Sequence, residues 1–138
     1  MPKYFTLTEL VRSNTALNKK IENIPSWESV EHLKELAGFL DKLREDYGKP
    51  IFVSSGYRSP QLNRTVGGVS SSVHQIGYAA DLQTSDMAGF IKFVKEWAVD
   101  KDFDQILIES SKTTTWVHVG LYNNKGEQRH KVFGIVVK

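Results

Sequence analysis

Apolar residues recur at helical spacing in two segments of the chain. The first is a long helix that begins at Ser26 and ends at Gly48 and Pro50, because a C-cap glycine followed by a proline stops a helix. The second begins at an Asp86 cap. We expect the apolar faces of both helices to form core: Trp27, Val30, Leu33, Leu36, Ala37, Leu40 and Leu43 on the first, and Phe90, Phe93, Val94 and Trp97 on the second.

Two shorter helices are indicated by their caps. Thr6 and Glu9 form a capping box for a short first helix, and Ser59 with Pro60 begins a helix that ends near Gly67 and Gly68. Shorter apolar runs predict five strands, at residues 51–54, 78–82, 103–109, 116–121 and 132–137. Early helices and late strands are typical of an α+β fold with a mainly antiparallel sheet. The 138 residues fit a single domain, 1–138.

Composition argues against several classes of protein. The chain has 18 Lys and Arg and 16 Asp and Glu, and the two signs are mixed along it. The net charge of +2 gives an electrostatic field too weak to indicate nucleic-acid binding. No stretch approaches the roughly 20 apolar residues that span a membrane, and the first residues lack the pattern of a secretory signal. We expect a monomer made in the cytoplasm, with no nucleic-acid or membrane partner.

Three residues suggest a metal site. The chain has no cysteine, so a metal ion must be held by His, Asp or Glu. His74 and Asp81 lie seven positions apart, across a turn expected at Gly77, and His118 lies in a later strand that a sheet can place beside them. Two imidazoles, one carboxylate and an open position form a donor set of catalytic zinc. The alternatives are a structural histidine at His118 and, at Asp81, a carboxylate that accepts backbone hydrogen bonds.

The residues around this set match one known family in order and in spacing. They are Ser55, Gly56, Tyr57, Arg58, Ser59 and Pro60, then Leu62, Asn63, Val66, Gly67 and Gly68, then Ser72, His74, Gly77, Ala79 and Asp81, and finally Trp116 and His118. This pattern resembles the zinc D-Ala-D-Ala carboxypeptidases and peptidoglycan endopeptidases. A second group resembles the branch found in phage lysins and bacterial wall hydrolases: Phe5, Glu9, Leu10, Ser13, Ala16, Asp104 and Gln105.

The resemblance implies a fold, a cofactor and an activity. The fold is the small α+β domain shared with the hedgehog signalling domain, and one Zn²⁺ per chain is bound by His74, Asp81 and His118. The activity is hydrolysis of peptide bonds in the stem peptides of bacterial peptidoglycan, as a carboxypeptidase or as an endopeptidase of the endolysin type. We expect such a protein to reach the cell wall by lysis-assisted release or by delivery with a particle.

The general base is where this chain departs from the family. The family's glutamate lies three residues before the last histidine ligand, where this chain has Thr115, and threonine cannot accept the proton. If Leu107 pairs with His118, and Glu109 therefore with Trp116, period-2 alternation places Glu109 on the His118 face. A slip of one residue would turn it away. We predict Glu109 as the base, against a solvated carboxylate at a hairpin end, and Asp104, on the opposite face, is the weaker candidate.

Further residues are candidates for the cleft. Arg58 follows a glycine turn, and its planar fork suits a carboxylate or a developing oxyanion; the alternative is a surface ion pair. By resemblance, Ser72 contacts substrate or orients the His74 loop, unless its hydroxyl only closes a turn. We expect Gln75, Tyr78, Gln105 and Trp116 to line the cleft, with Gln75 and Trp116 as substrate contacts; the alternative for each is packing or exposure to solvent. We expect His32 and His130 to be solvated.

Two functions therefore remain open. The first is a zinc peptidase that cuts stem peptides. The second is a non-enzymatic module in which zinc stabilises the fold or recognises wall peptide, and Thr115 at the position of the usual base keeps this alternative open. A carboxylate beside the metal site would favour the enzyme.

Overall fold

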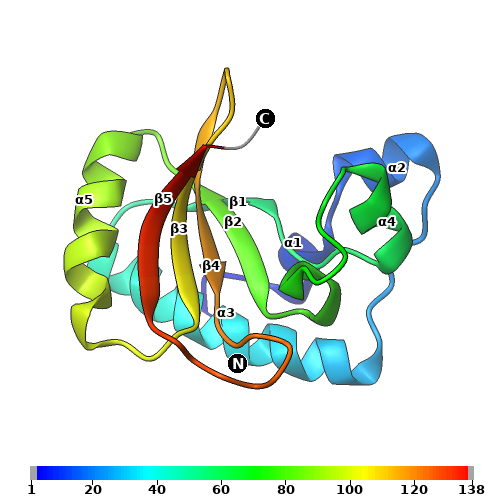
Figure 1. Cartoon of the computed structure of the whole chain (residues 1–138), viewed down its shortest axis with the longest axis horizontal. Coiled ribbons are helices and arrows are strands. Elements are labelled where there is room, and N and C mark those ends of the chain that lie inside the picture. Colours follow the sequence, from blue (N-terminus) through cyan, green and yellow to red (C-terminus); the bar gives the residue numbers. More distant parts are fainter. Residues whose placement is uncertain (1–2, 137–138) are drawn as a thin grey trace.

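A five-stranded sheet forms the centre of the molecule, which a computed structural model describes from residue 3 to residue 136 (Figure 1). Its strand order is β1-β2-β4-β3-β5. The three pairings among the first four strands are antiparallel, whereas β5 lies parallel to β3. The expected α+β class with a mainly antiparallel sheet is confirmed; position 137, where the last strand was expected to end, lies outside the described residues. The strands are β1 (Phe52–Ser55), β2 (Ala79–Gln83), β3 (Gln105–Ser110), β4 (Thr115–Gly120) and β5 (Lys131–Val136).

The helices begin at the caps that the sequence marks. The side chains of Thr6, Ser26, Ser59 and Asp86 each accept a hydrogen bond from a first-turn backbone N–H, which stabilises a helix start. None of the helices in residues 3–136 is both long and apolar enough to cross a membrane. The helices are α1 (Leu7–Val11), α2 (Asn14–Lys19), α3 (Trp27–Tyr47), α4 (Pro60–Thr65) and α5 (Met87–Trp97), with 3₁₀ turns η1 (Val73–Ile76) and η2 (Ala98–Asp100).

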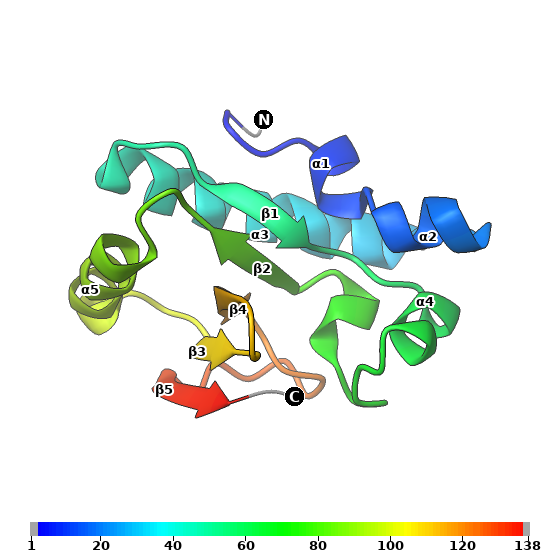
Figure 2. The same cartoon turned by 90° about the horizontal axis from the view of Figure 1, so that it is seen from above.

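The core lies between the sheet and the two long helices. Leu33, Leu36 and Leu40 of α3 are fully buried and pack in one cluster with Val117 and Val119 of β4. Because side chains alternate along a strand, the neighbouring residues of β4 point to the opposite face of the sheet, which these helices leave open. Figure 2 shows α3 along the sheet, with α2 and α4 gathered beyond one end of it.

Trp27 corrects the expected core. The tryptophan is the first residue of α3, and it is 86% exposed. The first turn of α3 extends past the end of the sheet (Figure 1), so Trp27 has no layer to pack against there. The apolar spacing is helical, but the buried apolar residues of α3 begin only at Leu33.

The strand register places the candidate residues next to one another on adjacent strands. Leu107 pairs with His118 and Glu109 with Trp116, so the expected hairpin register is confirmed. On the other side of β4, His118 pairs with Asp81 of β2. Asp81 and Glu109 therefore both lie close to His118, one on each flanking strand.

Candidate metal centre

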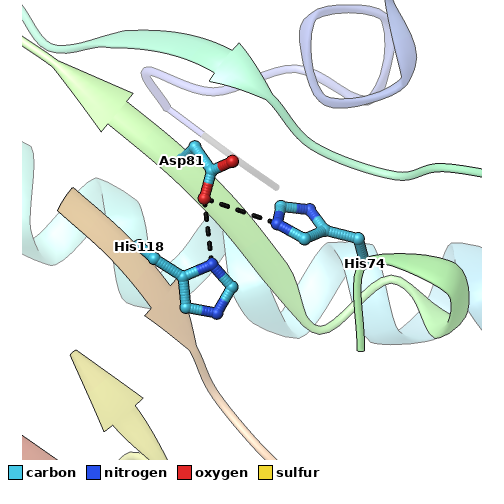
Figure 3. Close-up of side chains that lie close together, drawn as sticks. All are labelled: His74, Asp81 and His118. Atoms are coloured by element: carbon cyan, nitrogen blue, oxygen red, sulfur yellow. Dashed lines mark hydrogen bonds and ion pairs between the residues drawn. The ribbon is translucent and has the colours of Figure 1, made fainter. Parts of the chain in front are cut away.

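His74, Asp81 and His118 converge from three different elements (Figure 3). Asp81 Oδ1 lies 3.4 Å from His74 Nε2 and 2.9 Å from His118 Nδ1, and one ligand atom from each residue lies within 4.8 Å of the others. His74 and Asp81 are buried, at 2% and 9% exposure. The structure thus brings together the three residues that the sequence predicts as metal ligands.

A turn at Gly77 allows His74 and Asp81 to lie close together. Gly77 has a φ of +88°, a left-handed conformation that favours glycine, and a Cβ at this position would lie 2.6 Å from the carbonyl oxygen of Ser29. The chain can therefore reverse between η1 and β2 while pressed against α3. Ahead of the turn, the Ser72 hydroxyl accepts a hydrogen bond from the backbone N–H of His74, which is the local turn bond given above as the alternative for Ser72.

The hydrogen bonds of His74 determine its tautomer. His74 Nδ1 lies 2.7 Å from the carbonyl oxygen of Gly56. A carbonyl oxygen only accepts, so Nδ1 carries the proton and Nε2 presents its lone pair toward Asp81. Histidine ligands of metals are commonly oriented by such a bond through the other ring nitrogen.

The charges of the cluster also suit a cation. Burial lowers the pKa of His74, and the nearby carboxylate of Asp81 offsets this only in part. Burial alone would raise the pKa of Asp81, but the attraction and hydrogen bonds of the two imidazoles outweigh it and the pKa is lowered. Burial likewise opposes the charged form of His118, yet its hydrogen bond to Asp81 raises its pKa. An ionised carboxylate and a neutral His74 are the forms that bind a metal, so the three residues fit a Zn²⁺ ion.

A cavity of about 730 Å³ opens onto this cluster. Arg58, Ser72, Gln105, Glu109 and Trp116 line it together with the three clustered residues. The other lining residues lie in the loop after α4 and in the loop between β4 and β5, together with Val73, Asp104 and Leu107. The cluster is therefore accessible to a ligand as well as mostly buried, the combination expected of a binding site.

Arg58 lines this cavity and also has a buried donor atom without a hydrogen-bond partner in residues 3–136. Its backbone N–H donates to the carbonyl oxygen of His74 at 3.0 Å, which ties the arginine to the cluster of His74, Asp81 and His118. Its Nε atom is buried and has no hydrogen-bond partner among the described residues. Burial lowers the pKa of Arg58, although the charges of Asp81 and Glu109 oppose this. The surface ion pair that was the alternative for Arg58 is not formed in residues 3–136, and its guanidinium suits an anionic group in the cavity.

Glu109 lies on the face of the sheet that the sequence predicts. One of its carboxylate oxygens, Oε1, accepts a hydrogen bond of 2.7 Å from Trp116 Nε1, so the side chain is held in place rather than freely solvated. A carboxylate has more than one acceptor position, and Glu109 also lines the cavity. At the position of the family's usual base, the Thr115 hydroxyl is hydrogen-bonded to the Ser110 hydroxyl at 3.1 Å.

Comparison with known proteins agrees with this site. Residues 3–120 match the family model described as Peptidase M15. The chain belongs to the Peptidase M15 family. A stretch of 44 residues is also 50% identical to a zinc D-Ala-D-Ala carboxypeptidase of Streptomyces albus G, covering 31% of this chain and 17% of that protein. The family resemblance inferred from the motifs is confirmed.

Two of the expected cleft residues of this M15 chain lie elsewhere. The Gln75 amide donates to the carbonyl oxygens of Ser70 and Ser72, and the Tyr78 hydroxyl donates to Glu35 on α3. Neither residue lines the cavity beside the metal cluster. This corrects the expectation for both: the amide of Gln75 is used to close its own loop, and the ring of Tyr78 packs against α3.

Asp104 is already bound to another residue of this M15 chain. Its Oδ1 lies 2.6 Å from Arg129 Nε, and its Oδ2 lies 2.9 Å from Arg129 Nη2. The carboxylate is 2% exposed and also accepts the backbone N–H of Arg129. Because this bidentate pair ties the residue before β3 to the loop before β5, Asp104 has a structural role and is a poor general base.

His32 corrects another expectation. His32 Nδ1 lies 2.7 Å from the carbonyl oxygen of Ile76, and its ring stacks on Tyr78 with centroids 3.9 Å apart. This contact joins α3 to the turn that carries His74, and it was missed because nothing in the local sequence marks it. His130 is exposed, as expected, although its ring also lies against Phe103.

Proposed function

We propose that this chain is a zinc-dependent peptidase that hydrolyses peptide bonds in the stem peptides of bacterial peptidoglycan. The observation that carries the proposal is that Arg58 and Glu109 line the same cavity as His74, Asp81 and His118. A bare structural metal site needs neither an unpaired guanidinium nor a second carboxylate. Membership of a peptidase family and the local identity to a zinc carboxypeptidase support the same conclusion.

The three clustered residues would hold the metal. When bound, Zn²⁺ supplies Lewis acidity that polarises the scissile carbonyl and the attacking water. The Gly56 carbonyl keeps the Nε2 lone pair of His74 directed at the cluster, and the charge of Asp81 balances part of the positive charge. Burial of these groups strengthens their electrostatic interactions with a cation.

Arg58 and Glu109 have complementary tasks in hydrolysis. The Arg58 guanidinium would stabilise either a substrate carboxylate or the negative charge that develops on the carbonyl oxygen. The Glu109 carboxylate would accept a proton from the attacking water and pass it to the amine nitrogen as the C–N bond breaks. Trp116 holds one oxygen of that carboxylate, so proton transfer falls to the remaining acceptor positions.

We further propose that the chain acts on the bacterial wall as a monomer, in the manner of a phage endolysin. The N-terminal residues that resemble the lysin branch support this assignment. A non-enzymatic wall-binding module is the alternative that Thr115 left open, and the placement of Glu109 beside His118 argues against it.

Digestion of purified peptidoglycan tests the proposal. The zinc-loaded protein is incubated with the wall, with and without a chelator, and the products are identified by mass spectrometry. Glu109→Gln is the test variant, and Glu96→Gln, at an exposed position on α5, is its matched control. Zinc-dependent release of new peptide termini, lost in Glu109→Gln only, supports the peptidase. Wall binding without any cleavage would show a binding module instead.

A further inference from the structure

A second cavity, of about 600 Å³, adjoins the metal cavity. Arg58 and Val66 line both cavities, so these two residues lie between the two spaces. Each has the size usual for a small-ligand site, and together they offer more room than a single terminal residue requires. The second cavity lies between residues 9–15, at the junction of α1 and α2, and residues 52–58, which run from β1 to Arg58.

The walls of this second cavity are firmly joined. The carbonyl oxygen of Leu10 accepts the backbone N–H of Tyr57 at 2.7 Å. Gly56 approaches Leu10 so closely that a Cβ would collide with the same carbonyl oxygen. The turn that presents Arg58 is therefore fastened to α1. Glu9 and Ser13, which resemble the lysin branch and have no part in the metal centre, line this cavity.

β1 is an edge strand that borders the cavity. It pairs with β2 on one side only, and all four of its residues line the cavity. In a regular antiparallel pair, alternate residues direct their backbone N–H and C=O groups away from the partner strand. The β1–β2 register is regular at Phe52 and Val53 and shifts between Val53 and Ser55. Within residues 3–136, no protein group bonds the outward groups of β1. A free strand edge beside a cavity is the arrangement that binds an extended peptide by strand addition.

We propose that this edge binds an extended segment of the substrate peptide, several residues from the bond that is cut. The inference rests on the proposed peptidase function and specifies its substrate as a long or cross-linked peptide, with chain on both sides of the cut bond. The protein is then an endopeptidase rather than an enzyme that trims a terminal residue.

The register of β1 and β2 makes the two sites compatible. Ser55, the last residue of β1, pairs with Asp81. A peptide added outside β1 lies two strand spacings from β2, or about 10 Å, a distance that about three extended residues cover. The four residues of β1 span roughly 13 Å at the rise of a β-strand, which accommodates about four peptide residues. The distance from this edge to His74, Asp81 and His118 is therefore within the reach of one continuous peptide.

A matched pair of substitutions on α2 tests the second cavity. Asn14 lines the cavity, and Asn18 on the same helix does not; both are exposed. The substrates are a single stem pentapeptide and a cross-linked dimer of stem peptides. We expect Asn14→Trp to fill the cavity and raise KM for the dimer about tenfold, a loss of about 1.4 kcal/mol in binding. The pentapeptide should be cut at an unchanged rate, and Asn18→Trp should match the wild type on both substrates. Equal behaviour of the two variants on the dimer would overturn the proposal.

A binding measurement separates this inference from the proposed catalysis. The zinc-loaded Glu109→Gln protein is titrated by calorimetry with uncut peptides that are N-methylated at one position at a time. Because successive backbone N–H groups of a strand point in opposite directions, strand addition predicts weaker binding for methylation at alternate positions only. A flat response would exclude strand addition, even if the wild type cuts peptidoglycan. If methylation at alternate positions weakens binding but the wild-type protein cuts no substrate, the peptide groove is supported and the peptidase function is rejected.

Discussion

Trp116 holds Glu109 across the β3–β4 hairpin. The two residues are direct partners in the strand register, and the indole N–H donates to Oε1 at 2.7 Å. This bond keeps the carboxylate within the cavity that contains His118. We therefore expect Trp116→Phe to lower kcat about tenfold, since hydrogen bonds to charged groups contribute roughly 1.5–3 kcal/mol. Metal content, measured by elemental analysis, should not change; an unaltered kcat would show that Glu109 does not depend on the indole.

Removal of the carboxylate itself should have a larger effect. We expect Glu109→Gln to reduce hydrolysis by about 10² to 10⁴, the usual contribution of a general base, while the protein still binds its metal. Steady-state rates on a stem peptide, with Glu96→Gln as control, measure the loss. If Glu109→Gln cuts normally, the base is another group.

One Zn²⁺ per chain is expected on the three clustered residues. His74→Ala and His118→Ala should each lose the metal, because each removes one of three ligands, whereas His130→Ala, at an exposed position, should retain it. Elemental analysis gives the stoichiometry. A chelator should also lower the thermal midpoint of the wild type, since a ligand at a hundredfold excess over Kd stabilises a fold by about 2.7 kcal/mol. Full occupancy in both cluster variants would refute the assignment.

Arg58→Lys should fold normally and lose most activity. A lysine offers a point charge in place of the planar guanidinium fork, and removal of one oxyanion donor typically costs about 10² to 10³ in rate. Circular dichroism checks the fold, and kcat/KM checks the activity. Arg64→Lys, at an exposed position on α4, is the matched control. Wild-type turnover by Arg58→Lys would remove Arg58 from the mechanism.

The Asp104–Arg129 pair should make stability depend on pH. Burial alone would raise the pKa of Asp104, but the hydrogen bonds from Arg129 outweigh it and the pKa is lowered. The stabilisation is thus complete above the unfolded pKa, about 3.9, and is lost as the pH falls through the folded value. Urea unfolding should show Arg129→Gln less stable than the wild type at pH 7, because the Asp104 carboxylate loses its paired donors. The difference should shrink as the pH falls below 3.9; a difference independent of pH would contradict this.

Much of the site follows from local sequence. The turn at Gly77, which brings His74 and Asp81 together, and the caps at Ser26 and Asp86 depend on residues adjacent in the chain. Alternation limits the β3–β4 register, because a slip of one residue would turn Glu109 away from the face that carries His118, and the observed pairing keeps the two on one face. These features rest on short-range sterics and period-2 or period-3.6 patterns, which a sequence displays directly.

Tertiary structure decided the contacts between distant segments. His32 binds the Ile76 carbonyl across 44 positions, Arg129 pairs with Asp104 across 25, and Leu10 meets Tyr57 at the wall of the second cavity. The exposure of Trp27 likewise depends on where the sheet ends. Nothing local distinguishes these residues from solvated ones, since each acquires its partner only when whole elements dock. The sequence by itself thus determined which residues could form the metal site, and packing determined what holds them and where a peptide can lie.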